Sequence, residues 1–138
     1  MIYAVDFDGT LCKNAWPEIG EPNTPLIEFL KREQAEGDEL ILWTMREGGA
    51  LDEALAWCAK NGLTFDAVND NAESQKKLYG NNPRKVYADL YIDDHNSRTH
   101  PFDNPAAWCW YSMAAKAQRA AEGVGPYEKT EARREHGD

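Results

Sequence analysis

Acidic side chains stand directly after two short apolar runs of this sequence. Asp6 and Asp8 follow the run IYAV, and Asp93 and Asp94 follow the run LYI. If both runs are strands of one parallel sheet, their carboxyl ends meet at the edge where such sheets bind ligands. Carboxylates that close cannot all stay ionised unless a cation neutralises them. Oxygen ligands without a cysteine or histidine cage suit Mg²⁺, so these residues predict a magnesium site.

A polar residue after a third apolar run would extend this chemistry to phosphate. Thr44 follows the apolar run LILW, so its hydroxyl and the nearby N–H groups would donate hydrogen bonds there. A carboxylate nucleophile, a metal ion and such donors together make a phosphoryl-transfer site. A calcium loop is the alternative for DFDG, but a 12-residue loop beginning at Asp6 would end at Pro17, with no acidic residue to close it.

The rest of the pattern predicts strands that alternate with helices. We expect strands at residues 2–5, 40–43, 65–68 and 90–92, and helices from a Thr24 cap to Gly37, at 51–61 and at 105–121. Strands that alternate with helices of this length are typical of parallel βαβ units with right-handed crossovers. Residues 7–23 and 69–83 are expected to be loops, and residues 123–138 a flexible tail after a single domain at 1–122.

Composition narrows the class of protein. The 138 residues suffice for one domain, and no apolar run is long enough to span a bilayer, so we expect no membrane partner. A net charge of −9 argues against nucleic acid as a partner. Three widely spaced cysteines and the absence of a signal-peptide pattern favour a reducing cytoplasm, without a disulfide framework or a zinc site.

The three motifs together resemble the haloacid dehalogenase-like (HAD) superfamily. DFDGTL at 6–11 is similar to its first motif, LILWTMR at 40–46 to its second, and YIDD at 91–94 to its acidic fourth motif. The resemblance implies a Rossmann-like three-layer α/β/α sandwich with a mostly parallel sheet and the acidic strand beside the first strand. The segments between the motifs leave room for a small flap but for no cap domain, as in small cap-less members.

The resemblance also implies a role for each residue of the motifs. Asp6 would attack phosphorus and form an aspartyl-phosphate, and Asp8 would protonate the leaving oxygen and then activate water. The metal ligands would be Asp6, Asp93, the backbone carbonyl of Asp8, and Asp94 directly or through water. The phosphate-binding set would be Gly9, Thr10, Thr44, Arg46 and a lysine. Arg46 has the equal alternative of pairing with a carboxylate.

The lysine that this family needs has three candidates in the sequence. Lys85 is favoured because it stands just before the acidic-motif strand, whereas Lys76 and Lys77 lie further upstream, where a solvated loop charge is the alternative.

His95 is expected to be a loop histidine. Trp16 would either stack on a sugar or base of the substrate or be buried beneath the flap.

The resulting expectation is an enzyme: a Mg²⁺-dependent phosphomonoester hydrolase that acts on a small phosphorylated metabolite. A phosphatase for nucleic-acid ends is one alternative, and the acidic balance argues against it. A non-catalytic metal-binding or partner-binding module that retains the fold is another, and the complete pair of Asp6 and Asp8 argues against that.

Overall fold

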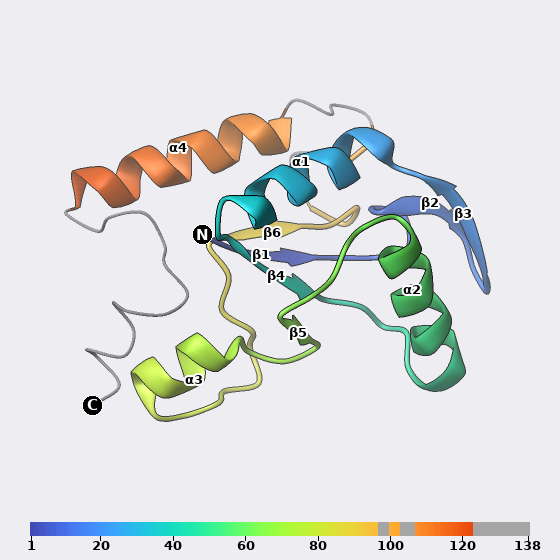
Figure 1. Ribbon diagram of the computed structural model, residues 1–138, viewed down its shortest axis with the longest axis horizontal. Helices are drawn as coiled ribbons and strands as arrows, with labels where there is room; N and C mark the ends of the chain where they lie inside the picture. The colour runs from blue at the N-terminus through green and yellow to red at the C-terminus, as the bar shows by residue number, and fades with distance from the viewer. Residues whose placement is uncertain (97–99, 103–106, 123–138) are drawn as a thin grey trace.

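A computed structural model describes residues 1–96, 100–102 and 107–122, so the expected tail at 123–138 lies outside the described residues. The fold is α/β, with four parallel strands in the order β5-β4-β1-β6 (Figure 1). These strands are β1 (Ile2–Val5), β4 (Glu39–Leu42), β5 (Ala67–Val68) and β6 (Leu90–Ile92). The helices are α1 (Thr24–Ala35), α2 (Gly48–Lys60), α3 (Glu73–Tyr79) and α4 (Ala107–Ala121). The expected α/β class with a parallel sheet is confirmed.

Alternating side chains of β1 build a core on each face of the sheet. Tyr3 and Val5 belong to the larger core, which includes buried residues of α1 and α2 and the partly buried Cys109 and Ala115 of α4. Ile2 and Ala4 face the other side, where the smaller core forms. Figure 1 shows α1 and α4 above the sheet and α3 below it. Burial on both faces explains why β1 is a continuous apolar run.

The central position of β1 aligns the ends of two strands. Val5 is in register with Ile92 of β6, and the Asp6 N–H donates a hydrogen bond to the Ile92 carbonyl at 2.9 Å. The residues that follow β1 and β6 therefore start side by side at the carboxyl edge of the sheet. The expected neighbourhood of the first strand and the acidic-motif strand is confirmed.

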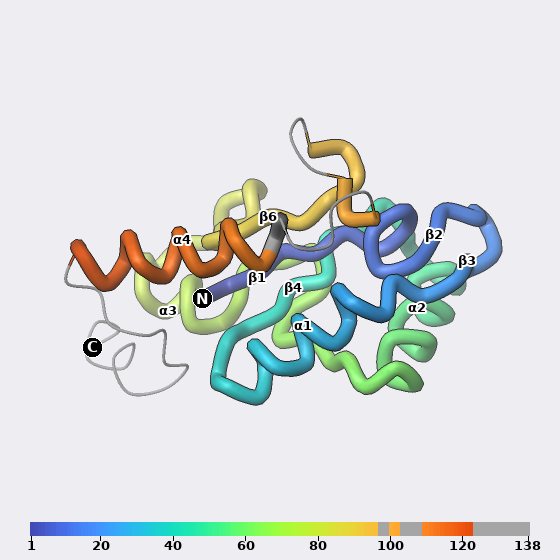
Figure 2. The backbone as a smooth tube through the Cα atoms, turned by 90° about the horizontal axis from the view of Figure 1, so that it is seen from above, coloured from blue at the N-terminus to red at the C-terminus, as the bar shows by residue number. Residues whose placement is uncertain are grey.

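Two stretches expected to be loops contain regular structure. Residues 7–23 include an antiparallel hairpin of β2 (Cys12–Ala15) and β3 (Glu18–Pro22), which lies beside α2 (Figure 2). Residues 69–83 include α3, which ends at Gly80 with a φ of +69°. Most hairpin side chains are exposed, so the hairpin has no apolar alternation in sequence, and α3 is only seven residues long.

The cap of the first helix lies one residue earlier than expected. Asn23, not Thr24, is the N-cap, and its side chain accepts a hydrogen bond from the Leu26 N–H. Pro25 lies in the first turn, where its missing N–H is not needed.

In the described part of the chain, no helix combines the length and apolarity that a membrane span requires.

Candidate active site

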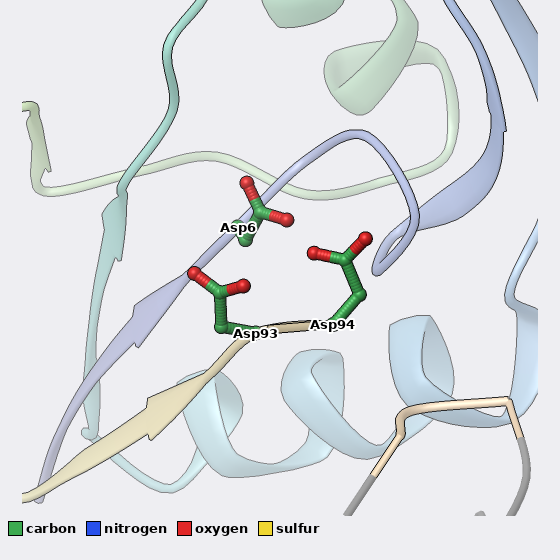
Figure 3. A group of neighbouring side chains, drawn as sticks. All are labelled: Asp6, Asp93 and Asp94. Carbon is green, nitrogen blue, oxygen red and sulfur yellow. The ribbon is translucent and has the colours of Figure 1, made fainter. Parts of the chain in front are cut away.

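Three carboxylates gather at the carboxyl edge of the sheet. Asp6 follows β1, and Asp93 and Asp94 follow β6. Each offers one oxygen to a group in which all the oxygens lie within 4.8 Å of one another. Figure 3 shows the three side chains turned toward a common space. The structure therefore brings together the residues that the sequence selected as side-chain metal ligands.

Burial makes this group of negative charges costly. Burial, followed by the neighbouring Asp93, raises the pKa of Asp6 to about 8. Burial also raises the pKa of Asp93. Asp94 Oδ1 is buried and has no hydrogen-bond partner among the described residues. A divalent cation would neutralise these carboxylates. It would also bind the Asp94 oxygen that accepts no hydrogen bond, so the residues present fit Mg²⁺.

Thr10 and Gly9 hold the carboxylates in place. The buried Thr10 hydroxyl donates to Asp6 Oδ2 at 3.0 Å and accepts from the Asp94 N–H at 3.1 Å. Gly9 has a φ of +84°, and a Cβ there would lie 2.2 Å from Asp94 Oδ2. Both residues were expected to bind phosphate. Phosphate binding by these two residues stays a prediction, and in the structure the Thr10 hydroxyl and the bare Cα of Gly9 organise the acidic group.

The acidic group opens into a hollow of about 580 Å³. The hollow is lined by Asp6, Asp8, Asn14, Trp16, Thr44, Met45, Arg46, Asp93, Asp94 and His95. Met45 is 98% exposed and Trp16 is 59% exposed, so both apolar side chains stand at its rim. Trp16 is therefore not buried beneath the flap. A polar floor with an apolar rim suits a phosphate attached to an organic group.

Asp8 lines the same hollow and is paired with a cation, Arg46. Its Oδ2 and Oδ1 accept hydrogen bonds from Nε and Nη2 of Arg46, both at 2.8 Å. Such a two-pronged guanidinium–carboxylate pair fixes the orientation of the carboxylate. Of the two alternatives for Arg46, the structure shows the pairing with a carboxylate.

Thr44 borders the hollow from the end of β4. Its N–H donates to Asn69 Oδ1 at 2.8 Å, and its hydroxyl oxygen accepts from the Arg46 N–H at 3.1 Å. The hydroxyl hydrogen is left for a ligand. Asn69, which anchors Thr44 from the end of β5, has a φ of +51°. Asn69 was not predicted as a site residue from the sequence, although asparagine is among the few residues that adopt this backbone conformation readily.

The structure does not bring the candidate lysines to the carboxylates. Lys85 lines a different hollow, of about 640 Å³, together with Tyr79 of α3. Lys76 forms ion pairs with Asp70 at 2.6 Å and Glu73 at 3.3 Å. Lys77 is exposed on α3. Within the described ranges, no lysine lines the hollow that contains Asp6, and its cation is Arg46.

Comparison with known proteins places the chain in a family. No family model matches it, and neither does a curated protein. A solved structure of a conserved protein from Bacteroides thetaiotaomicron is 38% identical, with a TM-score of 0.69. The match covers 91% of this chain and 98% of the other. The chain belongs to the same family as this conserved protein. The shared fold therefore extends over most of both chains.

Proposed function

We propose that this protein is a Mg²⁺-dependent phosphomonoester hydrolase that acts through an aspartyl-phosphate on Asp6. The observation that carries the proposal is the gathering of Asp6, Asp93 and Asp94 within 4.8 Å, at the end of two adjacent parallel strands. The sequence motifs that resemble the HAD superfamily support the same reaction. The fold that this resemblance implies is a Rossmann-like sandwich without a cap domain. The absence of a lysine from the described lining departs from that pattern.

The first step forms a bond between Asp6 and phosphorus. An Asp6 oxygen attacks phosphorus, the bond to the ester oxygen breaks, and the departing oxygen takes the proton of Asp8. Asp8 enters this step as the carboxylic acid and leaves it as the carboxylate that pairs with Arg46. Thr44 donates a hydrogen bond to the phosphoryl oxygens. Bound Mg²⁺, held by Asp6, Asp93 and Asp94, would supply positive charge that balances both the carboxylates and the phosphoryl group.

The second step returns Asp6 to its starting state. Asp8 takes a proton from a water molecule, the oxygen of this water attacks phosphorus, and the bond from phosphorus to Asp6 breaks. The products are inorganic phosphate and the free carboxylate. The open hollow with Trp16 and Met45 at its rim supports a small phosphorylated metabolite as the substrate. The three widely spaced cysteines favour the cytoplasm as the compartment of this reaction.

An assay of the full chain with an aryl phosphate, with and without Mg²⁺, tests this proposal. We expect hydrolysis that requires Mg²⁺ and is abolished by Asp6→Asn. Asp8→Asn should retain a residual rate, because general acid–base catalysis contributes roughly 10²–10⁴-fold and aryl leaving groups need little protonation. The Asp8→Asn protein should also accumulate an acid-labile phosphoryl group. Hydrolysis by Asp6→Asn at the parental rate would overturn the proposal.

A further inference from the structure

Arg46 connects the candidate acid–base residue to the hairpin. Besides its pair with Asp8, its Nη2 donates to the backbone carbonyls of Pro17 at 3.4 Å and Glu18 at 3.1 Å. Its Nη1 donates to the Ala50 carbonyl in the first turn of α2 at 3.3 Å. Only 2% of Arg46 is exposed, so these partners take the place of water around the guanidinium.

Two aromatic rings complete the surroundings of this guanidinium. Its central carbon lies 5.0 Å from the ring centre of the buried Phe7 and 4.9 Å from that of Trp16. Both distances are within the range of cation–π contacts. The Phe7 ring comes from the loop that carries Asp8, whereas the Trp16 ring comes from the tip of the hairpin. Arg46 therefore binds both segments through hydrogen bonds and through ring contacts.

The hairpin has few other attachments to the body of the protein. Cys12 is its buried apolar residue, and Ile19 is partly buried against the core. The segment between them, residues 13–18, is exposed. Arg46 thus supplies the polar anchor for a tip that has no core of its own. Asn14 and Trp16 of this tip also line the hollow, where a ligand would touch them.

We propose that Arg46 is a positioning residue that joins the β2–β3 hairpin to Asp8, so that a ligand held against Trp16 also fixes the candidate proton donor. The chemical part of this inference rests on the proposed function, which gives Asp8 a proton to transfer. The structural part does not. It requires only that substitution of either partner of the Asp8–Arg46 pair loosens the hairpin.

Hydrogen exchange of the full chain tests the structural part without any enzyme activity. Asp8→Asn and Arg46→Lys both remove the two-pronged charged pair, because an amide has lost the charge and an ammonium lacks the planar fork. We expect the β2 and β3 amides to exchange roughly fivefold faster in both variants, with the β4 amides as the internal reference for global unfolding. Asp6→Asn is the matched control, since the Asp6 carboxylate accepts a hydrogen bond from Thr10 and is not among the hydrogen-bond partners of Arg46, and it should leave hairpin exchange unchanged.

Hydrogen exchange has two outcomes that would overturn the proposal. One is unchanged hairpin exchange in Asp8→Asn and Arg46→Lys. The other is an equal acceleration in Asp6→Asn, which would show that any change in this loop loosens the hairpin.

Leaving-group dependence tests the chemical part. A misplaced proton donor slows the hydrolysis of alkyl phosphates more than that of aryl phosphates, because the leaving oxygen of an alkyl phosphate needs a proton. Arg46→Lys should therefore lower kcat for an alkyl phosphate about 10- to 100-fold more than for an aryl phosphate. Equal losses for both esters would indicate a merely structural role. Equal rises in KM, with weaker inhibition by inorganic phosphate, would indicate direct phosphate binding. Either result overturns the positioning role.

The two measurements keep this inference separate from the proposed function. If the parent chain hydrolyses neither ester, the proposed function fails, and hydrogen exchange alone decides whether Arg46 joins Asp8 to the hairpin. If the parent is active but hairpin exchange is unchanged, the proposed function stands and the positioning role fails.

Discussion

At the scale of single residues, the acidic group depends on a glycine that brings two loops into contact. Gly9 adopts a φ of +84°, and its Cα faces the Asp94 carboxylate so closely that a Cβ would lie 2.2 Å from Oδ2. Contacts below 3.0 Å force something to move. The side chain that must move carries Oδ1, which accepts no hydrogen bond from the described residues. The requirement for glycine here is therefore both conformational and steric.

Gly9→Ala should impair both stability and the response to Mg²⁺. The backbone conformation costs a non-glycine residue roughly 1–3 kcal/mol, and the displaced Asp94 would no longer complete the ligand group. Gly80→Ala is the matched control, because Gly80 has a φ of +69° with nothing within 4 Å of its Cβ position. Thermal unfolding should show a loss of stability in both variants and a loss of the Mg²⁺-induced stabilisation in Gly9→Ala alone. Equal Mg²⁺ responses would contradict the role given to Gly9.

At the scale of elements, a charged cluster attaches α4 to α1. Lys116 of α4 forms ion pairs with Glu33 of α1 and, at 3.1 Å, with Asp38, which lies after α1. The two carboxylates are largely buried, with 15% and 8% of their side chains exposed. A buried hydrogen bond of 2.6 Å between Tyr3 and Ser112 attaches the same helix to β1. Lys116 and the N-terminal ammonium of Met1, which lies 2.9 Å from Asp38 Oδ1, therefore share the neutralisation of two carboxylates that are largely removed from water.

Lys116→Met should destabilise the protein because it leaves Glu33 without its cation, beside an Asp38 that is paired with the Met1 ammonium alone. Removing one partner of a fully buried pair costs about 3–5 kcal/mol, and the partial exposure of Lys116 reduces the expected loss to roughly 1–3 kcal/mol. Lys31→Met is the control, because Lys31 forms an exposed pair with Glu28 at 3.5 Å. The loss of stability in Lys31→Met should stay below about 1 kcal/mol. Urea unfolding measures both, and equal losses would rule out the cluster as the anchor of α4.

The same scale shows what the sequence could predict. The runs that form β1 and β6 are apolar and end in aspartate, so burial and parallel pairing were enough to predict their convergence. The hairpin was not predictable from apolar patterning, because residues 13–18 are exposed. The pair of Asp8 and Arg46 joins residues 38 positions apart. Its geometry depends on the hairpin and on the first turn of α2, which local sequence rules do not place.

At the scale of the whole molecule, the stability of the metal-free protein should fall as pH rises. Asp6 has a pKa of about 8 in the folded chain, against an ordinary value of 3.8 that we take for the unfolded chain. Between these values the folded chain holds a proton that the unfolded chain has released, so raising the pH favours unfolding. The raised pKa of Asp93 acts in the same direction. This loss of stability is absent below about pH 4 and complete above about pH 8.

Mg²⁺ should therefore stabilise the protein more at high pH than at low pH. The ion binds ionised carboxylates, which the folded chain forms readily only above the raised pKa of Asp6. Thermal unfolding with and without Mg²⁺ at pH 5.5 and pH 8.5 measures the difference. NaCl at matched ionic strength controls for screening of the net charge of −9. Asp6→Asn, which removes the titrating group, should stabilise the metal-free protein at pH 8.5 and reduce the pH dependence of the Mg²⁺ effect. A Mg²⁺ effect that is equal at both pH values, or equal to that of NaCl, would show that these carboxylates do not hold the ion.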